Sequence, residues 1–279
     1  NWLDLELERR GEGAKGKDGE PFQLHITNAT WGQDGYEFLP EYLDTLAVNY
    51  GAGMQLLDFA GDPDGSRVSI NDWVSDQTEG RIQDLIPPGV IDSLTRLVLT
   101  NAIYFGGAWA EAFDEAQTSD GVFHLLDGSQ VTVPMMTHTA SYSYGDGEGY
   151  QAVELPYDGE ELSMVIVLPD EDTFKAFEDS LDGDSVDATV NSLAYQEVAL
   201  TLPRFEIASD LNLVDALATM GMPTAFSMGA DFSGMDGTQD LFIGEVLHKS
   251  FITVDEAGTE AAAATAVEMQ LKGAPMEPI

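Results

Sequence analysis

Residues 255–265 read Asp-Glu-Ala-Gly-Thr-Glu-Ala-Ala-Ala-Ala-Thr, a run of small side chains directly after the apolar segment of residues 241–254. Local propensity favours a helix here, because alanine is the best helix former and Gly258-Thr259 could cap it. A run of small residues after a buried strand also fits a backbone that must slide into a tight space. Taken alone, the stretch favours an exposed Ala-rich helix, so the rest of the chain decides.

Charge along the same stretch repeats with a period of two, as side chains alternate along a strand. An Ala-rich helix has no reason to segregate charge in this way. We expect the uncharged side to face the interior of a sheet and the charged side to face solvent. The uncharged side comprises Thr259, Ala261, Ala263, Thr265 and Val267, and the charged side carries Glu260, Glu268 and Gln270.

Residues 256–265 resemble the motif Glu-x-Gly-Thr-Glu-Ala-Ala-x-Ala-Thr, the reactive-loop hinge of the serpins, which are serine protease inhibitors. Other serpin motifs occur upstream in family order, and the resemblance runs over residues 1–279. These motifs are Thr100-Asn101-Ala102-Ile103-Tyr104-Phe105 with Trp109 and Phe113, Leu202-Pro203-Arg204-Phe205, Met220-Gly221-Met222 with Ala225-Phe226, Ala230-Asp231-Phe232-Ser233-Gly234, and Val246-Leu247-His248-Lys249. The resemblance implies an α+β fold with a large mixed sheet, smaller sheets, surrounding helices and an exposed reactive loop near the C-terminus.

The residue pattern supports this fold class independently. Apolar runs predict long strands at residues 96–106 and 241–256, and residues 121–136 and 197–207 are among the further strands. Residues 66–75 are predicted to be a helix. Strands and helices mix without βα alternation, which indicates the α+β class. By resemblance, the reactive loop inserts between the two long strands, and the helix lies across the front of the main sheet.

The resemblance also implies the limits of the domain. Residues 1–279 correspond to a single serpin domain, and residues 257–279 to its reactive-centre loop. Serpins begin with further helices and continue for several strands beyond the loop. The chain therefore resembles a fragment that is incomplete at both ends.

Three groups of residues take roles by resemblance to the family. Trp109, Arg204 and Glu256 correspond to the breach, where the loop first enters the sheet, with Arg204 and Glu256 as an ion pair. Asn101 and His248 correspond to the shutter, a polar cluster that helps control opening of the sheet. An ordinary surface ion pair and a satisfied core histidine are the alternatives. The hinge comprises Gly258, Thr259, Glu260, Ala261, Ala262, Ala263, Ala264 and Thr265.

The position of the cleaved bond follows from the serpin register. Counting fourteen residues on from Gly258 places the scissile bond at Lys272-Gly273. A lysine suits a trypsin-like pocket with a carboxylate at its base. A slip of one residue would instead present Leu271 to a chymotrypsin- or subtilisin-like pocket. A surface lysine placed by chance is the remaining alternative.

The chain is strongly acidic, with 50 Asp and Glu residues against 11 Lys and Arg and a formal net charge of −39. Because nucleic acids require basic patches, this composition argues against nucleic-acid binding, and it also argues against anionic membranes. The acids are scattered along the chain, which fits solvated carboxylates in a salt-adapted, halophilic source, where screening relieves self-repulsion. An acidic partner-binding face is the alternative.

Other chemistry finds little support in the residues. The chain has no cysteine, so disulfides and thiolate sites are excluded. Its four histidines lack metal-ligand spacing, and no Gly-x-Ser-x-Gly elbow is present. Residues 11–17 nearly form a phosphate loop, but Asp18 stands where the metal-binding hydroxyl should be. We therefore expect no metal, no cofactor and no enzymatic activity.

Taken together, the residues and the resemblance predict a monomeric inhibitory serpin that acts as a suicide substrate. A trypsin-like serine protease is the favoured target, with subtilisin- and chymotrypsin-like enzymes left open. The family resemblance favours an extracellular location, although no signal peptide is visible. One alternative is a serpin-fold protein without inhibitory function, such as a chaperone or storage protein. Another is an unrelated acidic binding module, in which residues 259–271 would be helical.

Overall fold

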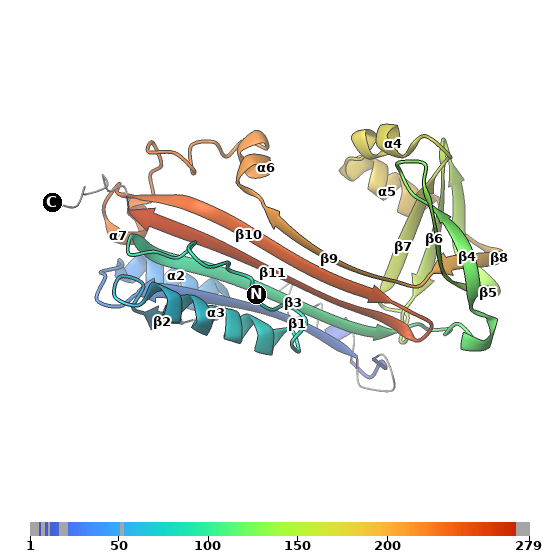
Figure 1. Ribbon diagram of the computed structural model, residues 1–279, viewed down its shortest axis with the longest axis horizontal. Helices are drawn as coiled ribbons and strands as arrows, with labels where there is room; N and C mark the ends of the chain where they lie inside the picture. The colour runs from blue at the N-terminus through green and yellow to red at the C-terminus, as the bar shows by residue number, and fades with distance from the viewer. Residues whose placement is uncertain (1–5, 7–8, 11, 17–21, 51–52, 272–279) are drawn as a thin grey trace.

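The structure is a computed structural model that describes residues 6, 9–10, 12–16, 22–50 and 53–271. Two β-sheets form most of it, and the smaller sheet stands at one end of the larger one (Figure 1). Helix α3 lies on one face of the larger sheet and α2 packs on the opposite face, while α4 and α5 accompany the smaller sheet. This mixture of sheets and helices confirms the predicted α+β class.

The larger sheet has six strands in the order β2-β1-β3-β11-β10-β9. Strands β1 and β2 are parallel, and every other neighbouring pair is antiparallel. The two long strands predicted from the sequence are β3 and β10. The strands are β1 (Gln23–Gln33), β2 (Met54–Leu57), β3 (Thr95–Ala108), β9 (Phe205–Asn212), β10 (Leu241–Val254) and β11 (Gly258–Leu271).

Residues 258–271, which include the Ala-rich stretch, form β11, a central strand of this sheet. β11 lies between β3 and β10 and is antiparallel to both. The predicted exposed loop is therefore wrong for residues 258–271 in this structure, and a helix at 259–271 is excluded. Pairing along both edges gives the backbone N–H and C=O groups of β11 partners in two strands, which outweighs the helix propensity of its alanines.

The smaller sheet has the order β4-β5-β6-β7, with β8 paired to β5. The strand predicted at 121–136 is in fact two strands, because a turn with Gly128 at φ 81° separates β4 from β5. The strand predicted at 197–207 is also two, since β8 ends at Pro203 and β9 belongs to the larger sheet. The strands are β4 (Ser119–His124), β5 (Gln130–Gly147), β6 (Tyr150–Pro156), β7 (Ser163–Pro169) and β8 (Ala194–Pro203).

Helix α3 is the helix predicted at residues 66–75, and it lies across one face of the larger sheet (Figure 1). It begins after Asp62, whose carboxylate accepts the Gly65 N–H at 3.0 Å, with Pro63 at the first helical position. The sequence prediction missed α5, although a capping box at its start was a readable signal. The helices are α2 (Pro40–Tyr50), α3 (Pro63–Gln77), η2 (Glu115–Gln117), α4 (Phe174–Ser180), α5 (Gly183–Ser192), α6 (Val214–Thr219) and α7 (Ser233–Asp236).

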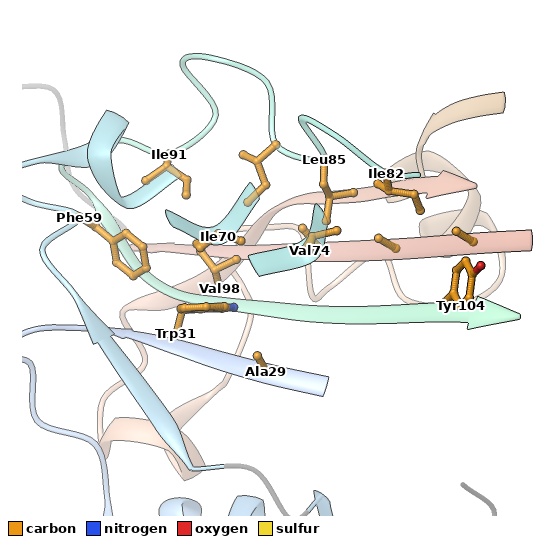
Figure 2. Close-up of a cluster of buried hydrophobic side chains, with 14 residues drawn as sticks. Ala29, Trp31, Phe59, Ile70, Val74, Ile82, Leu85, Ile91, Val98 and Tyr104 are labelled. Atoms are coloured by element: carbon orange, nitrogen blue, oxygen red, sulfur yellow. The ribbon is translucent and has the colours of Figure 1, made fainter. Parts of the chain in front are cut away.

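The largest buried cluster fills the space between α3 and the larger sheet (Figure 2). Ala262, Ala264 and Ala266 of β11 belong to this cluster and are at most 2% exposed. Their small side chains let α3 and the segment after it pack close to the strand. Larger members of the cluster are Trp31, Ile70, Val74, Ile82, Leu85, Val98 and Tyr104.

This packing reverses the predicted orientation of β11. The even-numbered side chains from Glu260 to Glu268 are buried on the α3 side, whereas the odd-numbered side chains from Ala261 to Val267 are half-buried. The prediction placed both glutamates in solvent, because burying a charge is costly. The structure instead leaves Glu260 only 8% and Glu268 only 2% exposed. Helix α3 and the segment after it cover this side of the strand. The surroundings of the two buried carboxylates differ.

Candidate functional site

The candidate site is the slot between β3 and β10 that β11 occupies. At its start, Gly258 lies so close to β3 that a Cβ on it would be 2.1 Å from the Gly107 carbonyl oxygen. Glycine is therefore required here, because its lack of a side chain permits this approach. Thr259, the next residue, is only 1% exposed. The first two hinge residues thus occupy a space with no room for larger side chains.

Glu260 is held by a bidentate ion pair with Arg81. The Nε and Nη2 atoms of Arg81 donate to the two carboxylate oxygens at 2.6 and 2.7 Å. The Tyr104 hydroxyl, from β3, donates to Oε1 at 2.9 Å. Glu260 raises the pKa of Arg81, and burial, with the bond to Glu260, raises the pKa of Tyr104 to about 12. Glu260 is thus a buried carboxylate whose charge is compensated.

Glu268, near the other end of β11, forms no ion pair with a basic side chain among the described residues. Thr95 Oγ1 donates to its Oε1 at 2.6 Å. Its Oε2 is buried against Gly244, with the Gln270 amide nearby but no hydrogen bond of good geometry. Burial raises the pKa of Glu268 to about 7.

Two like charges add to this effect on Glu268. Glu245 lies directly opposite in β10, and Asp92 precedes β3; both raise the pKa, while the hydrogen bond from Thr95 opposes the rise. Among the described residues, no Lys, Arg or His forms an ion pair with Glu268. Its charge is therefore buried without compensation by any of these residues, and its raised pKa lets the neutral form persist up to a pH of about 7.

The three predicted breach residues lie together beside the turn between β10 and β11. Trp109 Nε1 donates to the Asp255 carbonyl at 2.9 Å. Arg204 Nη1 lies 3.7 Å from Glu256 Oε2, and Thr118 donates to Glu256 Oε1 at 2.7 Å. Glu256 is buried, whereas Arg204 is half exposed. The predicted contact between Arg204 and Glu256 is present, and its role in loop insertion stays a prediction.

The two predicted shutter residues are separated by β11. Thr265 pairs in register with Asn101 on one side and with His248 on the other. Its hydroxyl lies 2.8 Å from His248 Nδ1, while Asn101 Nδ2 donates to Asn28 Oδ1 at 3.1 Å. A hinge threonine thus occupies the row between them. Sequence reasoning missed this link, and the shutter role itself stays a prediction.

The predicted scissile bond and the partners of the two buried glutamates are the remaining parts of the site. Lys272 and Gly273, the predicted scissile bond, lie outside the described residues. The partners of the two buried glutamates, which are Arg81, Tyr104 and Thr95, were not predicted. No local signal marks them, because each contact joins residues more than 150 positions apart in the chain.

The residues that the structure describes show neither a metal-binding cluster nor a membrane-spanning helix. Those residues contain no group of three or more His, Asp or Glu side chains arranged to hold a metal ion. None of the described helices has the length and apolar character needed to cross a membrane. The site consists of the strand slot and the side chains that line it.

Comparison with known proteins agrees with this architecture. The chain matches the family described as serpin (serine protease inhibitor) over residues 8–279. It is 41% identical over 263 residues to an uncharacterized serpin-like protein of Thermococcus kodakarensis. The aligned region covers 94% of this chain and 61% of that protein. It is 42% identical over 260 residues to the leukocyte elastase inhibitor of Homo sapiens. This alignment covers 90% of this chain and 69% of that protein.

Solved structures show the same likeness. Cleaved Serpin 42Da superimposes with a TM-score of 0.87 at 34% identity, over 96% of this chain and 71% of that one. Ovalbumin from emu (Dromaius novaehollandiae) gives a TM-score of 0.90 at 28% identity, over 99% of this chain and 71% of that one. The chain belongs to the serpin family. It spans 61% of the length of the Thermococcus relative.

Proposed function

We propose that the protein inhibits a serine protease as a suicide substrate and catalyses no reaction of its own. The observation that carries this proposal is β11. Residues 258–271, which directly precede the predicted scissile bond, occupy the slot between β3 and β10 as a full-length strand. Membership of the serpin family and similarity to the leukocyte elastase inhibitor support the same function.

The chemistry follows from the proposed cleavage at Lys272-Gly273. The protease serine oxygen attacks the Lys272 carbonyl carbon, and an ester forms as the peptide bond to Gly273 breaks. The Gly273 nitrogen leaves as an amine, having taken a proton from the protease. The freed hinge then inserts as β11. Fourteen residues at about 3.3 Å each carry the attached protease about 46 Å along the sheet.

The inserted strand supports the proposal by its side chains as well as by its position. Its first residues are small and uncharged, apart from Glu260, and they fit the close approach to β3 and α3. The energy that drives insertion would come from new backbone pairing on both edges of β11 and from burial of its alanines. Water would then reach a distorted acyl-enzyme too late to release the protease.

The test uses the full-length protein and trypsin. We expect a covalent complex that survives detergent, and mass spectrometry of the released peptide should place the cut at Lys272-Gly273. The substitution Lys272→Leu should move inhibition toward chymotrypsin- or subtilisin-like enzymes. Lys175→Leu, at an exposed lysine on α4, is the matched control and should change nothing.

Two outcomes would contradict the proposal at different levels. Unchanged trypsin inhibition by the Lys272→Leu variant would place the scissile bond elsewhere, with Leu271 as the first alternative. Cleavage without any covalent complex, for every serine protease tested, would make the protein a serpin-fold protein without inhibitory function.

A further inference from the structure

Arg81 sits on a turn whose hydrogen bonds are made by α3 and the turn itself. The turn follows α3, where Thr78 Oγ1 donates to the Val74 carbonyl at 2.8 Å and accepts the Ile82 N–H at 3.1 Å. Gly80, with φ at 74°, donates its N–H to the Ser75 carbonyl at 2.8 Å. The backbone conformation that presents Arg81 is therefore held by hydrogen bonds that do not involve β11.

The Arg81 side chain also contacts β10. Its guanidinium lies 5.6 Å from the centre of the Phe251 ring on β10. The side chain remains 44% exposed even with β11 in the sheet. The cation can therefore stay hydrated while the slot is empty, and it needs little rearrangement to receive a carboxylate.

Burial of Glu260 in the slot without a partner would carry a large free-energy cost. It lies on the buried α3 side of β11, where only 8% of its surface remains exposed. A carboxylate in that position would be buried without a partner if Arg81 were absent, and burying an unpaired charge is costly. Tyr104 supplies one hydrogen bond but no positive charge.

We propose that Arg81 is a positioning residue for loop insertion, which receives Glu260 and fixes the hinge in register between β3 and β10. This inference rests on the proposed function and names a residue that makes the insertion step efficient. A slip of one residue would turn Glu260 to the other side of the sheet and present Thr259 or Ala261 to Arg81. The ion pair can form only in the correct register.

The guanidinium group suits this task better than an amine. Arginine presents a planar fork that matches both carboxylate oxygens, whereas lysine acts as a single point charge. The two nearly equal distances, 2.6 and 2.7 Å, are those of a bidentate pair. In a chain with only 11 basic residues against 50 acidic ones, one arginine is placed against the loop hinge.

The test compares Arg81→Met and Glu260→Gln in the full-length protein. Methionine keeps an unbranched stem beside Phe251 and removes the charge. We expect each variant to insert its loop roughly tenfold more slowly, equal to ~1.4 kcal/mol in the barrier. The number of inhibitor molecules consumed per protease trapped should rise several-fold, while the first association rate stays unchanged.

A double variant and two controls make the assignment specific. Arg81→Met combined with Glu260→Gln should be no worse than Glu260→Gln alone, because both changes remove one interaction. Arg81→Lys should lie between Arg81→Met and the wild type. Arg96→Met is the matched control, since Arg96 also lies beside an aromatic ring, that of Tyr36, and its hydrogen bonds go to the Ser93 and Thr95 carbonyls.

A second readout separates this inference from the proposed function. The loop-cleaved protein should melt at a lower temperature with Arg81→Met than with Arg96→Met, whether or not any protease is trapped. If the wild type traps no protease but this difference appears, the proposed function fails and the role of Arg81 stands. If the wild type traps protease and Arg81→Met traps it equally well, the role of Arg81 is overturned and the function stands. Equal melting temperatures for the two variants would also overturn the role of Arg81.

Discussion

The two ends of β11 each bury a glutamate on the same side of the same strand, and their surroundings are opposite. Glu260 meets a bidentate arginine and a tyrosine hydroxyl. Glu268 accepts a hydrogen bond from one threonine hydroxyl, and the negative charges of Glu245 and Asp92 raise its pKa. Glu260 thus forms an ion pair, whereas the raised pKa of Glu268, about 7, lets this carboxylate bind a proton near neutral pH.

This difference shows that burial alone does not fix the cost of placing a charge in the sheet. A buried ion pair repays part of the desolvation cost, whereas a buried unpaired carboxylate takes up a proton instead. Under the proposed insertion mechanism, β11 would pass through a charge-matching step near its start and a proton-binding step near its end. Substitutions at Thr259 or Glu260 change the start of β11, and substitutions at Glu268 change its end.

Thr259→Arg should have the largest effect, because it buries a charge without compensation at the start of the strand. Thr259 is only 1% exposed, and an arginine there should cost several kcal/mol, roughly 3–5. In the full-length protein we expect the loop to be cut and the protease to leave active. The measurement is the ratio of inhibitor consumed to protease trapped.

Thr259→Val is the matched control for this variant, because it nearly keeps the volume and adds no charge. It should trap protease as the wild type does. Trapping of one protease per inhibitor by Thr259→Arg would mean that burial of an unpaired charge at this position does not obstruct insertion.

Glu268 should make the inserted form pH-dependent. Its pKa rises from an ordinary 4.5 to about 7, so the inserted form holds an extra proton between these values. The contribution to the free energy of unfolding is therefore greatest below about pH 4.5 and falls as the pH rises to about 7. The total loss is about 3 kcal/mol, from about 1.4 kcal/mol for each unit of pKa.

Urea unfolding of the loop-cleaved protein from pH 4 to 9 would measure this effect. Because the chain has 50 acidic residues, the relevant quantity is the difference between the wild type and Glu268→Gln. The glutamine keeps an oxygen to accept the Thr95 hydroxyl and carries no charge. A difference that stays constant across this range would show that Glu268 does not titrate near pH 7.

Salt should have the smallest effect on the comparison between the two glutamates. The net charge of −39 predicts that folding of the whole chain needs high salt, which far-UV circular dichroism across a KCl series would show. Partly buried pairs such as Arg81 and Glu260 are screened less than surface charges. The difference between the wild type and Glu260→Gln should therefore change by less than about 0.5 kcal/mol.

Two results would count against this account of salt. Equal folding in dilute and molar KCl would remove the case for salt adaptation. Loss of the Glu260→Gln effect in high salt would mean that Arg81 and Glu260 behave as an ordinary surface pair.

The sequence predicted the parts of the fold that depend on ordered motifs and local pattern. The hinge motif, the two long strands and the helix at 66–75 all have their counterparts in β11, β3, β10 and α3. Period-two alternation predicted that residues 259–267 form a strand. The pair Asp127-Gly128 indicates a turn, but the apolar residues on both sides of it led to the prediction of one continuous strand.

Alternation cannot say which side of a strand is covered. That depends on α3, whose position over the sheet is set by contacts between distant parts of the chain. The prediction therefore assigned Glu260 and Glu268 to solvent on charge alone. Arg81 was the missing information for Glu260, and nothing in its local sequence distinguishes it from a surface arginine.

The central claim is that the two buried glutamates of β11 differ in compensation and not in burial. Urea unfolding of the loop-cleaved wild type, Glu260→Gln and Glu268→Gln at pH 8 tests it most directly. The same isosteric change should lower the free energy of unfolding, and with it the urea midpoint, at position 260, by about 2 kcal/mol for a lost charged hydrogen-bond pair, and raise both at position 268. Midpoints that move in the same direction for both variants would contradict the claim.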